Sequence, residues 1–339
     1  MYVLRPISQQ DFSALKEISI ESGPGFTSLP VDDDLLRSKI DNAQKMLTEA
    51  DDNLAEKEYI FVLEQTDNQQ IIGVTGIKTN VGSHLPLYHY RLEQDTHCCE
   101  HLNIHNQTQV LKVCNDYIGA TEVCTLYLRS AFRKGYAGRF MPRIRFLFMA
   151  NHPQLFSSKV IAEMRGVSDT QGHAPFWDGL PAHFFMTDFS TASHLRGIGQ
   201  IEFIESLMPK HPIYTCLLNE KARTVIGQVH PNTMPALKLL EKEGFCFKGY
   251  VDLFDAGPTV EAQLKHIHSV NNSTLSKVKI AQVKGDTTFA ICNLHIKQFR
   301  AVFSNNAEFE SENNCLLITE QLATKLSVKS GDTVRFIDL

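Results

Sequence analysis

One stretch near the middle of the chain constrains the fold more than any other. Two apolar runs, 123–128 (VCTLYL) and 160–164 (VIAEM), have the composition of buried strands. Between them lie a loop with two glycines, Gly135 and Gly138, and an apolar segment, 140–149, that is long enough for a helix. A strand, a glycine loop, a helix and a second strand predict a β-α-β crossover whose two strands are parallel.

The segments before this crossover predict a mixture of helices and strands. Residues 3–6 read as a short strand, and Asp11 can cap a helix that follows it. A second helix has apolar residues at helical spacing over 35–47. Residues 59–63 and 71–77 flank the polar sequence QTDNQQ, an arrangement typical of a β-hairpin.

A later segment, 227–245 (GQVHPNTMPALKLLEKEGF), combines a polar loop, a histidine and a helix. Asn232 can cap the helix N-terminus, and Gly244 can end the helix in the left-handed conformation. Five apolar residues of this helix predict a buried face: Met234, Ala236, Leu237, Leu239 and Leu240. A weaker copy of the pattern at 173–185 suggests two related α/β units.

The composition changes again after Gly257. Residues 266–276 are polar and rich in turn formers, and several β-rich pieces follow them. We therefore predict three domains, namely an N-terminal α/β unit, a second α/β unit that carries the histidine, and a small β-rich C-terminal segment. Their predicted ranges are 1–170, 171–265 and 266–339.

Composition and charge exclude several classes of protein. A chain of 339 residues, 43% hydrophobic and 21% charged, can bury a large core. The net charge of −5 argues against nucleic acid or an anionic membrane as a partner. The N-terminus lacks the pattern of a secretory signal, and no stretch approaches the ~20 apolar residues that span a bilayer. The eight cysteines are scattered, which is typical of reduced thiols, so we expect a cytoplasmic protein.

The glycine loop is the first candidate site. A glycine-rich turn at a helix N-terminus points N–H groups at a phosphate and adds the positive end of the helix dipole. Four cations around the loop are enough to hold a pyrophosphate or a 3′-phosphate: Arg133, Lys134, Arg139 and Arg143. Such turns are more often structural, so the loop alone does not establish a site. The order of elements, however, resembles that of the GNAT acyltransferases.

Longer segments resemble one family, the arginine N-succinyltransferases, which are related to the GNAT acyltransferases. The matching segments are SGPGFTSLP (22–30), EVCTLYL (122–128), AEMRGV (162–167), PFW (175–177), LMPKHPIY (207–214), VIGQVH (225–230), KEGF (242–245) and SGDTVR (330–335). The resemblance runs over about the whole chain. It implies an α/β fold of tandem GNAT-like acyltransferase units with mixed sheets, followed by a small β-rich C-terminal appendage.

The resemblance also implies roles for individual residues. His230 stands at the position of the family's catalytic acid/base, and Leu126 at that of a leucine that contacts succinyl-CoA. Arg133 and Gly138 belong to the phosphate-binding loop. In that loop Tyr136 stands where the family usually has Gly, which leaves the individual phosphate contacts open.

The residues fit this chemistry independently. An α-ammonium group has no lone pair, so a proton must be removed before the amine attacks a thioester, and the departing thiolate benefits from a proton. A histidine titrates near neutral pH and can do either. A helix N-terminus beside His230 would lower its pKa. Around Leu126, splayed parallel strands would leave backbone groups free to pair with the amides of pantetheine.

Candidate acceptor-binding residues lie at the end of a central strand. Glu163 and Arg165 flank that end, where open α/β sheets bind ligands. They could bind the guanidinium and the α-carboxylate of arginine, or instead form an internal ion pair. The turn at 22–28 could supply backbone donors to a carboxylate. Asp252 and Asp255 could face the guanidinium, although a surface turn is the more ordinary interpretation.

Two other features carry weaker hypotheses. The sequence 97–101 (HCCEH) and His105 contain metal-ligand types, but adjacent cysteines rarely bind one ion, so we expect an irregular surface loop there and no metal site. Cys124 lies within a predicted strand core and lacks an adjacent base, so it is not expected to be a nucleophile.

We therefore expect an N-acyltransferase that moves succinyl from succinyl-CoA to the α-amino group of L-arginine in arginine catabolism. Succinyl-CoA is a co-substrate, and no bound cofactor is expected. The chain is expected to form a homo-oligomer. The alternatives are a GNAT-type transferase with another acyl donor or with ornithine as acceptor, and a non-catalytic sensor of CoA or an amino acid. An acid/base at position 230 favours an enzyme over a sensor.

Overall fold

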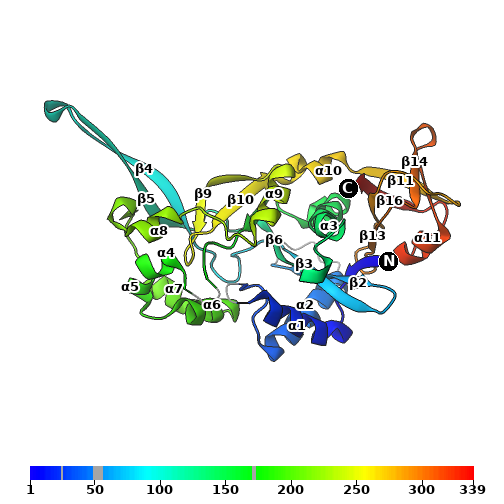
Figure 1. Ribbon diagram of the computed structural model, residues 1–339, viewed down its shortest axis with the longest axis horizontal. Coiled ribbons are helices and arrows are strands. Elements are labelled where there is room, and N and C mark those ends of the chain that lie inside the picture. The colour runs from blue at the N-terminus through cyan, green and yellow to red at the C-terminus, as the bar shows by residue number, and fades with distance from the viewer. Residues whose placement is uncertain (24–25, 49–55, 170–172) are drawn as a thin grey trace.

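The computed structural model describes residues 1–23, 26–48, 56–169 and 173–339. Within these ranges one sheet of 16 strands runs through the molecule, in the order β14-β15-β11-β16-β12-β13-β1-β2-β3-β6-β7-β10-β9-β4-β5-β8. Helices pack on both faces of its central part (Figure 1). This mixed α/β architecture, with additional strands at the C-terminus, agrees with the predicted fold class. No helix of the described ranges is long and apolar enough to cross a bilayer.

The crossover at the centre of the chain is confirmed. It consists of β6 (Thr121–Leu128), α3 (Ala137–Asn151) and β7 (Lys159–Glu163). The two strands are parallel, with Thr121 opposite Val160 and Glu122 opposite Ile161. Most of α3 is buried, because it lies between the central strands and the C-terminal strands (Figure 1).

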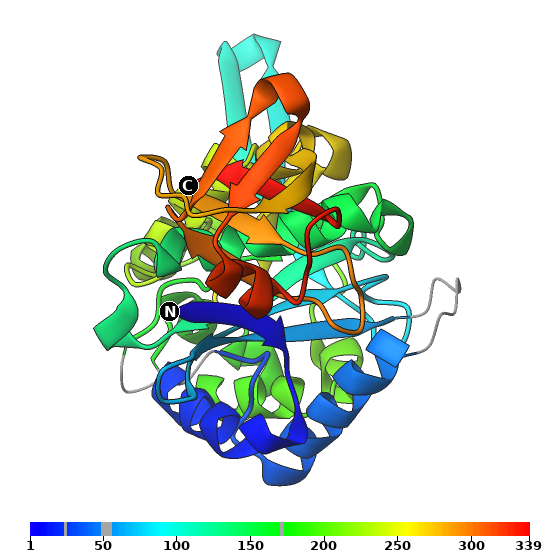
Figure 2. The same ribbon diagram turned by 90° about the vertical axis from the view of Figure 1, so that its right-hand side faces the viewer.

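The N-terminal part also forms as predicted. Its elements are β1 (Tyr2–Pro6), α1 (Phe12–Ser22), α2 (Asp33–Thr48), β2 (Glu58–Gln65) and β3 (Gln70–Lys78). Alternate residues of β2 belong to two different hydrophobic cores. Ile60 and Val62 pack with α1 and α2, whereas Phe61 and Leu63 pack with α3. Figure 2 shows α1 and α2 together on one side of these strands.

A long hairpin projects from the sheet where an irregular loop was expected (Figure 1). It consists of β4 (His89–Cys99) and β5 (Ile104–Cys114), which pair along their whole length. The segment 97–101 therefore belongs to the end of this hairpin, and the loop prediction was wrong.

The second α/β region contains short helices and three more strands of the sheet. Its elements are α4 (Pro175–Gly179), α5 (Ala182–Phe185), α6 (Phe189–Gly197), α7 (Glu202–Leu207), β8 (Ile213–Tyr214), α8 (Glu220–Thr224), α9 (Met234–Lys242), β9 (Cys246–Asp252), β10 (Pro258–Gln263) and α10 (His268–Asn272). Trp177 holds this core together, since it stacks on Phe185 at 5.5 Å and meets Phe254 edge-on at 5.0 Å.

Helix α9 differs from its prediction at the N-terminal end. Its N-cap is Thr233 rather than Asn232, and no side-chain cap is formed. Leu240 is buried, but Met234 is 38% exposed, so the predicted apolar face is buried only in its later part. Gly244 has a φ of 97°, which confirms the left-handed end of the helix.

The C-terminal segment is β-rich, as expected. It contains β11 (Thr274–Ile280), β12 (Phe289–Cys292), β13 (Ala301–Ser304), β14 (Ala307–Glu310), β15 (Cys315–Ile318), α11 (Glu320–Leu326) and β16 (Thr333–Asp338). Strand β13 pairs with β1, which joins this segment to the N-terminal strands in one sheet. The sequence did not predict α11 or β14. The ranges of the three domains stay predictions.

Candidate functional site

Strands β6 and β7 part soon after they start to pair. Beyond Glu122 the described residues of the two strands share no further ladder pair. A bulge follows in β6, because Val74 and Gly76 of β3 face Tyr127 and Cys124, which leaves Thr125 and Leu126 opposite one residue. Thr125 has a φ of 54°, an unusual conformation for a buried β-branched residue. The bulge places Leu126 half-buried at the opening between the strands.

The glycine loop lies between the end of β6 and the start of α3. Arg133 is fixed to β6, since its Nε donates to the Leu128 carbonyl oxygen at 2.9 Å. Gly138 lies in the first turn of α3, where N–H groups lack intrahelical acceptors. A Cβ atom at Gly138 would meet nothing nearer than the Arg133 carbonyl oxygen at 4.0 Å, so space remains beside it.

Three of the four cations expected around this loop are exposed, namely Arg133, Lys134 and Arg139. The fourth, Arg143, is already engaged. It pairs with Glu243 at 3.2 Å and donates to the Asp338 carbonyl oxygen at 2.6 Å. Arg143 thus ties α3 to other elements, and the positive charge available to a ligand comes from the other three.

His230 lies just beyond the end of β7. Its backbone N–H donates to the Arg165 carbonyl oxygen at 2.8 Å, which anchors the loop to that strand end. Its Nδ1 accepts the N–H of Asn232 at 3.1 Å, so the neutral ring carries its proton on Nε2. Partial burial and the Arg165 cation lower the pKa of His230, and a backbone hydrogen bond with Ser168 opposes them. Asn232 therefore orients the imidazole instead of capping α9.

Glu163 belongs to a buried network of charges. Its Oε2 lies 3.1 Å from Arg196 Nη2, and its Oε1 lies 2.8 Å from His89 Nε2. Arg196 also pairs with Asp252. Burial raises the pKa of Glu163, but Arg196 and His89 outweigh burial and hold it at about 2. Oε2 therefore accepts a hydrogen bond from Arg196, whereas Oε1 is buried close to His89 and has no hydrogen-bond partner within the described residues.

Arg165 takes no part in that network. Its Nη2 donates to the Ser168 hydroxyl at 2.9 Å, so the alternative in which Glu163 and Arg165 form an ion pair is wrong. Burial lowers the pKa of Arg165. Its Nε is buried and has no hydrogen-bond partner within the described ranges.

The turn that carries Asp252 and Asp255 is buried, so the interpretation as a surface turn was wrong. The carboxylate of Asp255 accepts the N–H groups of Gly166 at 2.7 Å and Gly257 at 2.8 Å. Burial and the neighbouring Asp252 raise the pKa of Asp255 to about 7. A Cβ atom at Gly257 would come within 2.0 Å of the Met164 carbonyl oxygen, so only glycine fits there. This turn braces the end of β7.

Sequence reasoning missed Arg196 and His89, which carry no local motif. Of the other candidates, Cys124 is buried, and burial raises the pKa of its thiol to about 12, far from that of a nucleophile. The turn at 22–28 lies partly outside the described residues, because positions 24 and 25 are not among them. The described ranges contain no group of three or more His, Cys, Asp or Glu residues placed to hold a metal ion.

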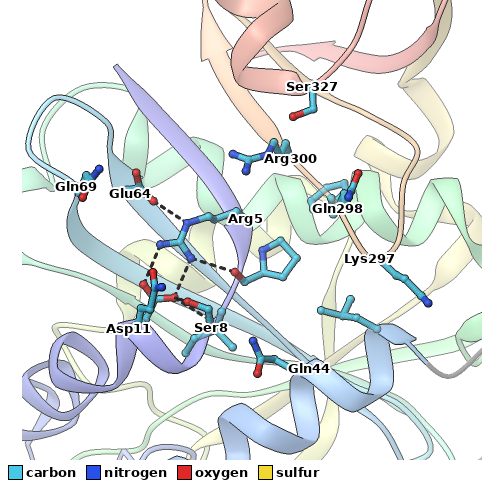
Figure 3. A pocket seen from close by; sticks show the side chains of 15 residues that line it. Arg5, Ser8, Asp11, Gln44, Glu64, Gln69, Lys297, Gln298, Arg300 and Ser327 are labelled. Atoms are coloured by element: carbon cyan, nitrogen blue, oxygen red, sulfur yellow. Dashed lines mark hydrogen bonds and ion pairs between the residues drawn. The ribbon is translucent and has the colours of Figure 1, made fainter.

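A hollow of about 770 Å³ lies elsewhere, between the first strand and the C-terminal segment (Figure 3). Its lining includes Arg5, Glu64 and Arg300. Arg5 is already satisfied, since it pairs with Asp11 at 2.8 Å and Glu64 at 2.6 Å. None of the predicted site residues lines this hollow.

Known proteins resemble the whole chain. A family described as "Arginine N-succinyltransferase beta subunit" matches residues 2–269, and its C-terminal domain matches residues 274–338. An arginine N-succinyltransferase from Yersinia enterocolitica is 40% identical over 344 residues, covering 100% of this chain and 98% of the relative. One from Escherichia coli is 39% identical over 341 residues, with the same coverage. The solved structure of arginine/ornithine succinyltransferase subunit AI from Pseudomonas aeruginosa superimposes with a TM-score of 0.91 at 32% identity, covering 100% of this chain and 98% of that one.

Proposed function

Because the chain belongs to the arginine N-succinyltransferase family of acyl-CoA-dependent N-acyltransferases, we propose that it transfers succinyl from succinyl-CoA to the α-amino group of L-arginine. The products are N2-succinyl-L-arginine and CoA, and the reaction belongs to arginine catabolism in the cytoplasm. The observation that carries the proposal is the position of His230, whose loop is bonded to the end of β7 beside the opening between β6 and β7.

The acyl donor is proposed to lie along β6 and the start of α3. The phosphates of CoA take the first-turn N–H groups of α3 and the cations of Arg133, Lys134 and Arg139. The amides of pantetheine pair with the backbone of β6 beyond Glu122, where β7 has turned away. Leu126 covers the apolar part of the donor. This arrangement aims the thioester at the end of β7.

His230 is proposed as the acid/base of the transfer. The α-ammonium group loses a proton, the free amine attacks the thioester carbonyl carbon, and the carbon–sulfur bond breaks as the thiolate takes up a proton. The lowered pKa of His230 keeps the ring neutral near pH 7, as a base requires. In the conformation observed, Nε2 carries the proton. Removing a proton from the substrate at Nε2 therefore requires the other tautomer, in which Nδ1 gives up the N–H of Asn232.

The acceptor is proposed to lie beyond the end of β7. The unpaired Nε of Arg165 supports a role in binding the α-carboxylate of the amino acid. Glu163 is a weaker candidate for the guanidinium than its position in the sequence suggested, because Arg196 binds its Oε2 and its Oε1 is buried beside His89.

Ornithine is a second proposed acceptor. The relative from Pseudomonas aeruginosa is titled an arginine/ornithine succinyltransferase subunit, and that chain shares the fold over its whole length. Ornithine keeps the α-amino acid end and a cation at the far end, so both sets of contacts proposed for arginine are available to it.

The proposal is tested by measuring release of the CoA thiol from a panel of acyl-CoAs with arginine, ornithine or citrulline as acceptor. Succinyl-CoA should be preferred over acetyl-CoA, because its terminal carboxylate requires a partner in the site. Citrulline lacks the distal charge. Losing one charge-assisted hydrogen bond, worth about 1.5–3 kcal/mol, should lower kcat/KM about ten- to a hundredfold. Equal rates with arginine and citrulline, or with succinyl-CoA and acetyl-CoA, would contradict the substrate assignment.

A further inference from the structure

The outer part of the β4–β5 hairpin, residues 92–109, projects away from the body of the molecule and is called the arm here (Figure 1). Strand β9 pairs with β4 only from His89 to Arg91, and β8 pairs with β5 only at Val110 and Leu111. Near its base the arm also contacts the body, since the Tyr214 hydroxyl donates to Asp95 at 2.6 Å and the Thr215 hydroxyl to the Gln109 carbonyl oxygen at 3.0 Å. Beyond these contacts, within the described ranges, the arm is a two-stranded ribbon that pairs with no further strand. It uses eight residues of β4, so it extends for about 27 Å.

A ribbon of this kind is not self-sufficient. A two-stranded hairpin is at best marginally stable in water, and open strand edges invite pairing with another chain. The tip also exposes apolar side chains, since Leu102 is 68% exposed and Ile104 is 47% exposed. Apolar side chains this far from the core contribute little to stability unless another surface removes them from water. The arm has the features of a contact element.

A receiving surface lies at the same end of the molecule. Met186, which follows α5, is 84% exposed, and Leu217 is 80% exposed. Leu217 lies beside the base of the arm, because the neighbouring Thr215 hydroxyl donates to the Gln109 carbonyl oxygen at 3.0 Å. Figure 1 shows α5 at this end, below the hairpin. The arm and the apolar side chains therefore lie at the same end of the molecule, but the arm points away from them.

The charges of the two surfaces are complementary. The arm carries three acidic residues, Glu93, Asp95 and Glu100, and no Lys or Arg. The segment 208–224, which includes Leu217, carries three cations and one carboxylate. An acidic ribbon and a basic apolar surface are suited to each other, and opposite charge favours the encounter.

We propose that the arm binds a second copy of this chain, in a two-fold dimer in which each arm lies across the surface around Met186 and Leu217 of the other copy. The arm and the receiving surface lie at one end of the molecule. A single two-fold axis can therefore place each arm on the receiving surface of the other copy. Covering one face and the tip of a ribbon about 27 Å long and about 10 Å wide removes on the order of 400 Å² from water on the arm. With equal areas on both receiving surfaces, the two contacts bury on the order of 1,600 Å², the size of a stable interface.

The first test is the oligomeric state of the full chain by sedimentation velocity at tens of micromolar. The wild type should have the mass of two chains. The double variant Leu102→Glu, Ile104→Glu should have the mass of one, with an unchanged circular dichroism spectrum because both side chains are exposed. The control is Leu275→Glu, another exposed leucine, in β11 at the opposite end of the molecule (Figure 1), and it should remain a dimer. A monomeric wild type, or a dimeric arm variant, would overturn the proposal.

The second test identifies the receiving surface. The double variant Met186→Glu, Leu217→Glu should also be monomeric. When it is mixed with the arm variant, each mixed pair regains one intact arm on one intact surface, so dimers containing both variants should form. Neither variant can form an intact contact by itself. If the surface variant is dimeric, or if the mixture contains only monomers, arm exchange through this surface is refuted.

Discussion

Replacing Arg196 by methionine should remove the central cation of the buried network beside β7. Arg196 contacts Glu163 at 3.1 Å, pairs with Asp252, and lies over the ring of Phe254 at 5.4 Å. Methionine keeps the apolar stem and deletes the charge. Glu163 and Asp252 would then both lose the cation that they share. His89 would be the remaining charged contact of Glu163.

The expected loss follows from these contacts. Removing one partner of a buried ion pair typically costs about 3–5 kcal/mol, because the other charge stays buried without compensation. The side chain of Arg196 is 19% exposed, so water relieves part of this cost. Two carboxylates lose a partner, however, and the contact with the aromatic ring of Phe254 is lost too. We expect the free energy of unfolding to fall by about 3–4 kcal/mol at pH 7.

Urea unfolding followed by tryptophan fluorescence measures this loss directly. The chain has one tryptophan, Trp177, which packs against Phe254 next to Arg196. The matched control is Lys16→Met, because Lys16 and Asp33 form an ion pair that is 42% and 50% exposed, and such pairs contribute less than about 1 kcal/mol. A loss of under 1 kcal/mol for Arg196→Met would refute the reasoning.

The same variant has a signature in pH. The pKa of Glu163 is held at about 2, below its ordinary value, so its contribution to stability is present above that ordinary value and is lost as the pH falls toward 2. Arg196→Met removes the largest part of this contribution, and His89 keeps a smaller part. The difference in stability between wild type and variant should therefore shrink as the pH is lowered from about 5. A difference that grows on acidification would contradict the assignment.

Three further predictions concern the reaction. His230→Ala should lower kcat by about 10²–10⁴ and retain succinyl-CoA binding. The control His211→Ala changes an exposed histidine and should leave kcat unchanged, so equal turnover in both variants would remove His230 from the mechanism. The acid limb of kcat/KM should have an apparent pKa below 6.5, since burial and Arg165 lower the pKa of His230 and only the neutral ring acts as a base; a limb above 6.5 would contradict this. Arg133→Ala combined with Gly138→Glu should weaken CoA binding in calorimetry and leave arginine binding unchanged. Space beside Gly138 admits the new side chain, so the double change acts through charge, and an unaltered CoA affinity would place the donor elsewhere.

The elements that the sequence predicted well are those with buried faces. The apolar runs of β2, β6 and β7 and the helical spacing of α2 mark such faces, and each was found. Gly244 was predictable as well, because a helix that ends in a left-handed residue favours glycine. In these cases the local sequence pattern is enough to indicate which residues are buried or where a helix ends.

The arm could not be predicted for the opposite reason. A strand shows alternating hydrophobicity only when one face is buried. From Glu93 to Cys99 and from Ile104 to Gln109 the residues are exposed or half-buried, so no alternation marks the two strands. The sequence of the arm therefore resembles that of a loop, although each residue pairs across the ribbon.

The charged network escaped prediction because its pairings depend on tertiary structure. Glu163 and Arg165 are two residues apart, and residues at that spacing share one face of a strand, which suggested an ion pair. Strand β7 ends at Glu163, however, so its alternation does not extend to Arg165. The partner of Glu163 is Arg196, 33 positions away on a short helix. Asp252 and Asp255 resembled the residues of a surface turn, since nothing local indicates that the turn is covered by β7 and α6.

The network and the proposed acid/base meet at one point, the end of β7. Asp255 holds the N–H of Gly166, and the carbonyl oxygen of Arg165, one residue earlier, holds the N–H of His230. The network thus fixes the backbone from which the imidazole is positioned, without contacting the imidazole itself. Buried charges are costly, and an apolar core of the same volume is often as stable. Their presence here is accounted for if the strand end must be held in one position while a substrate cation and anion bind next to it.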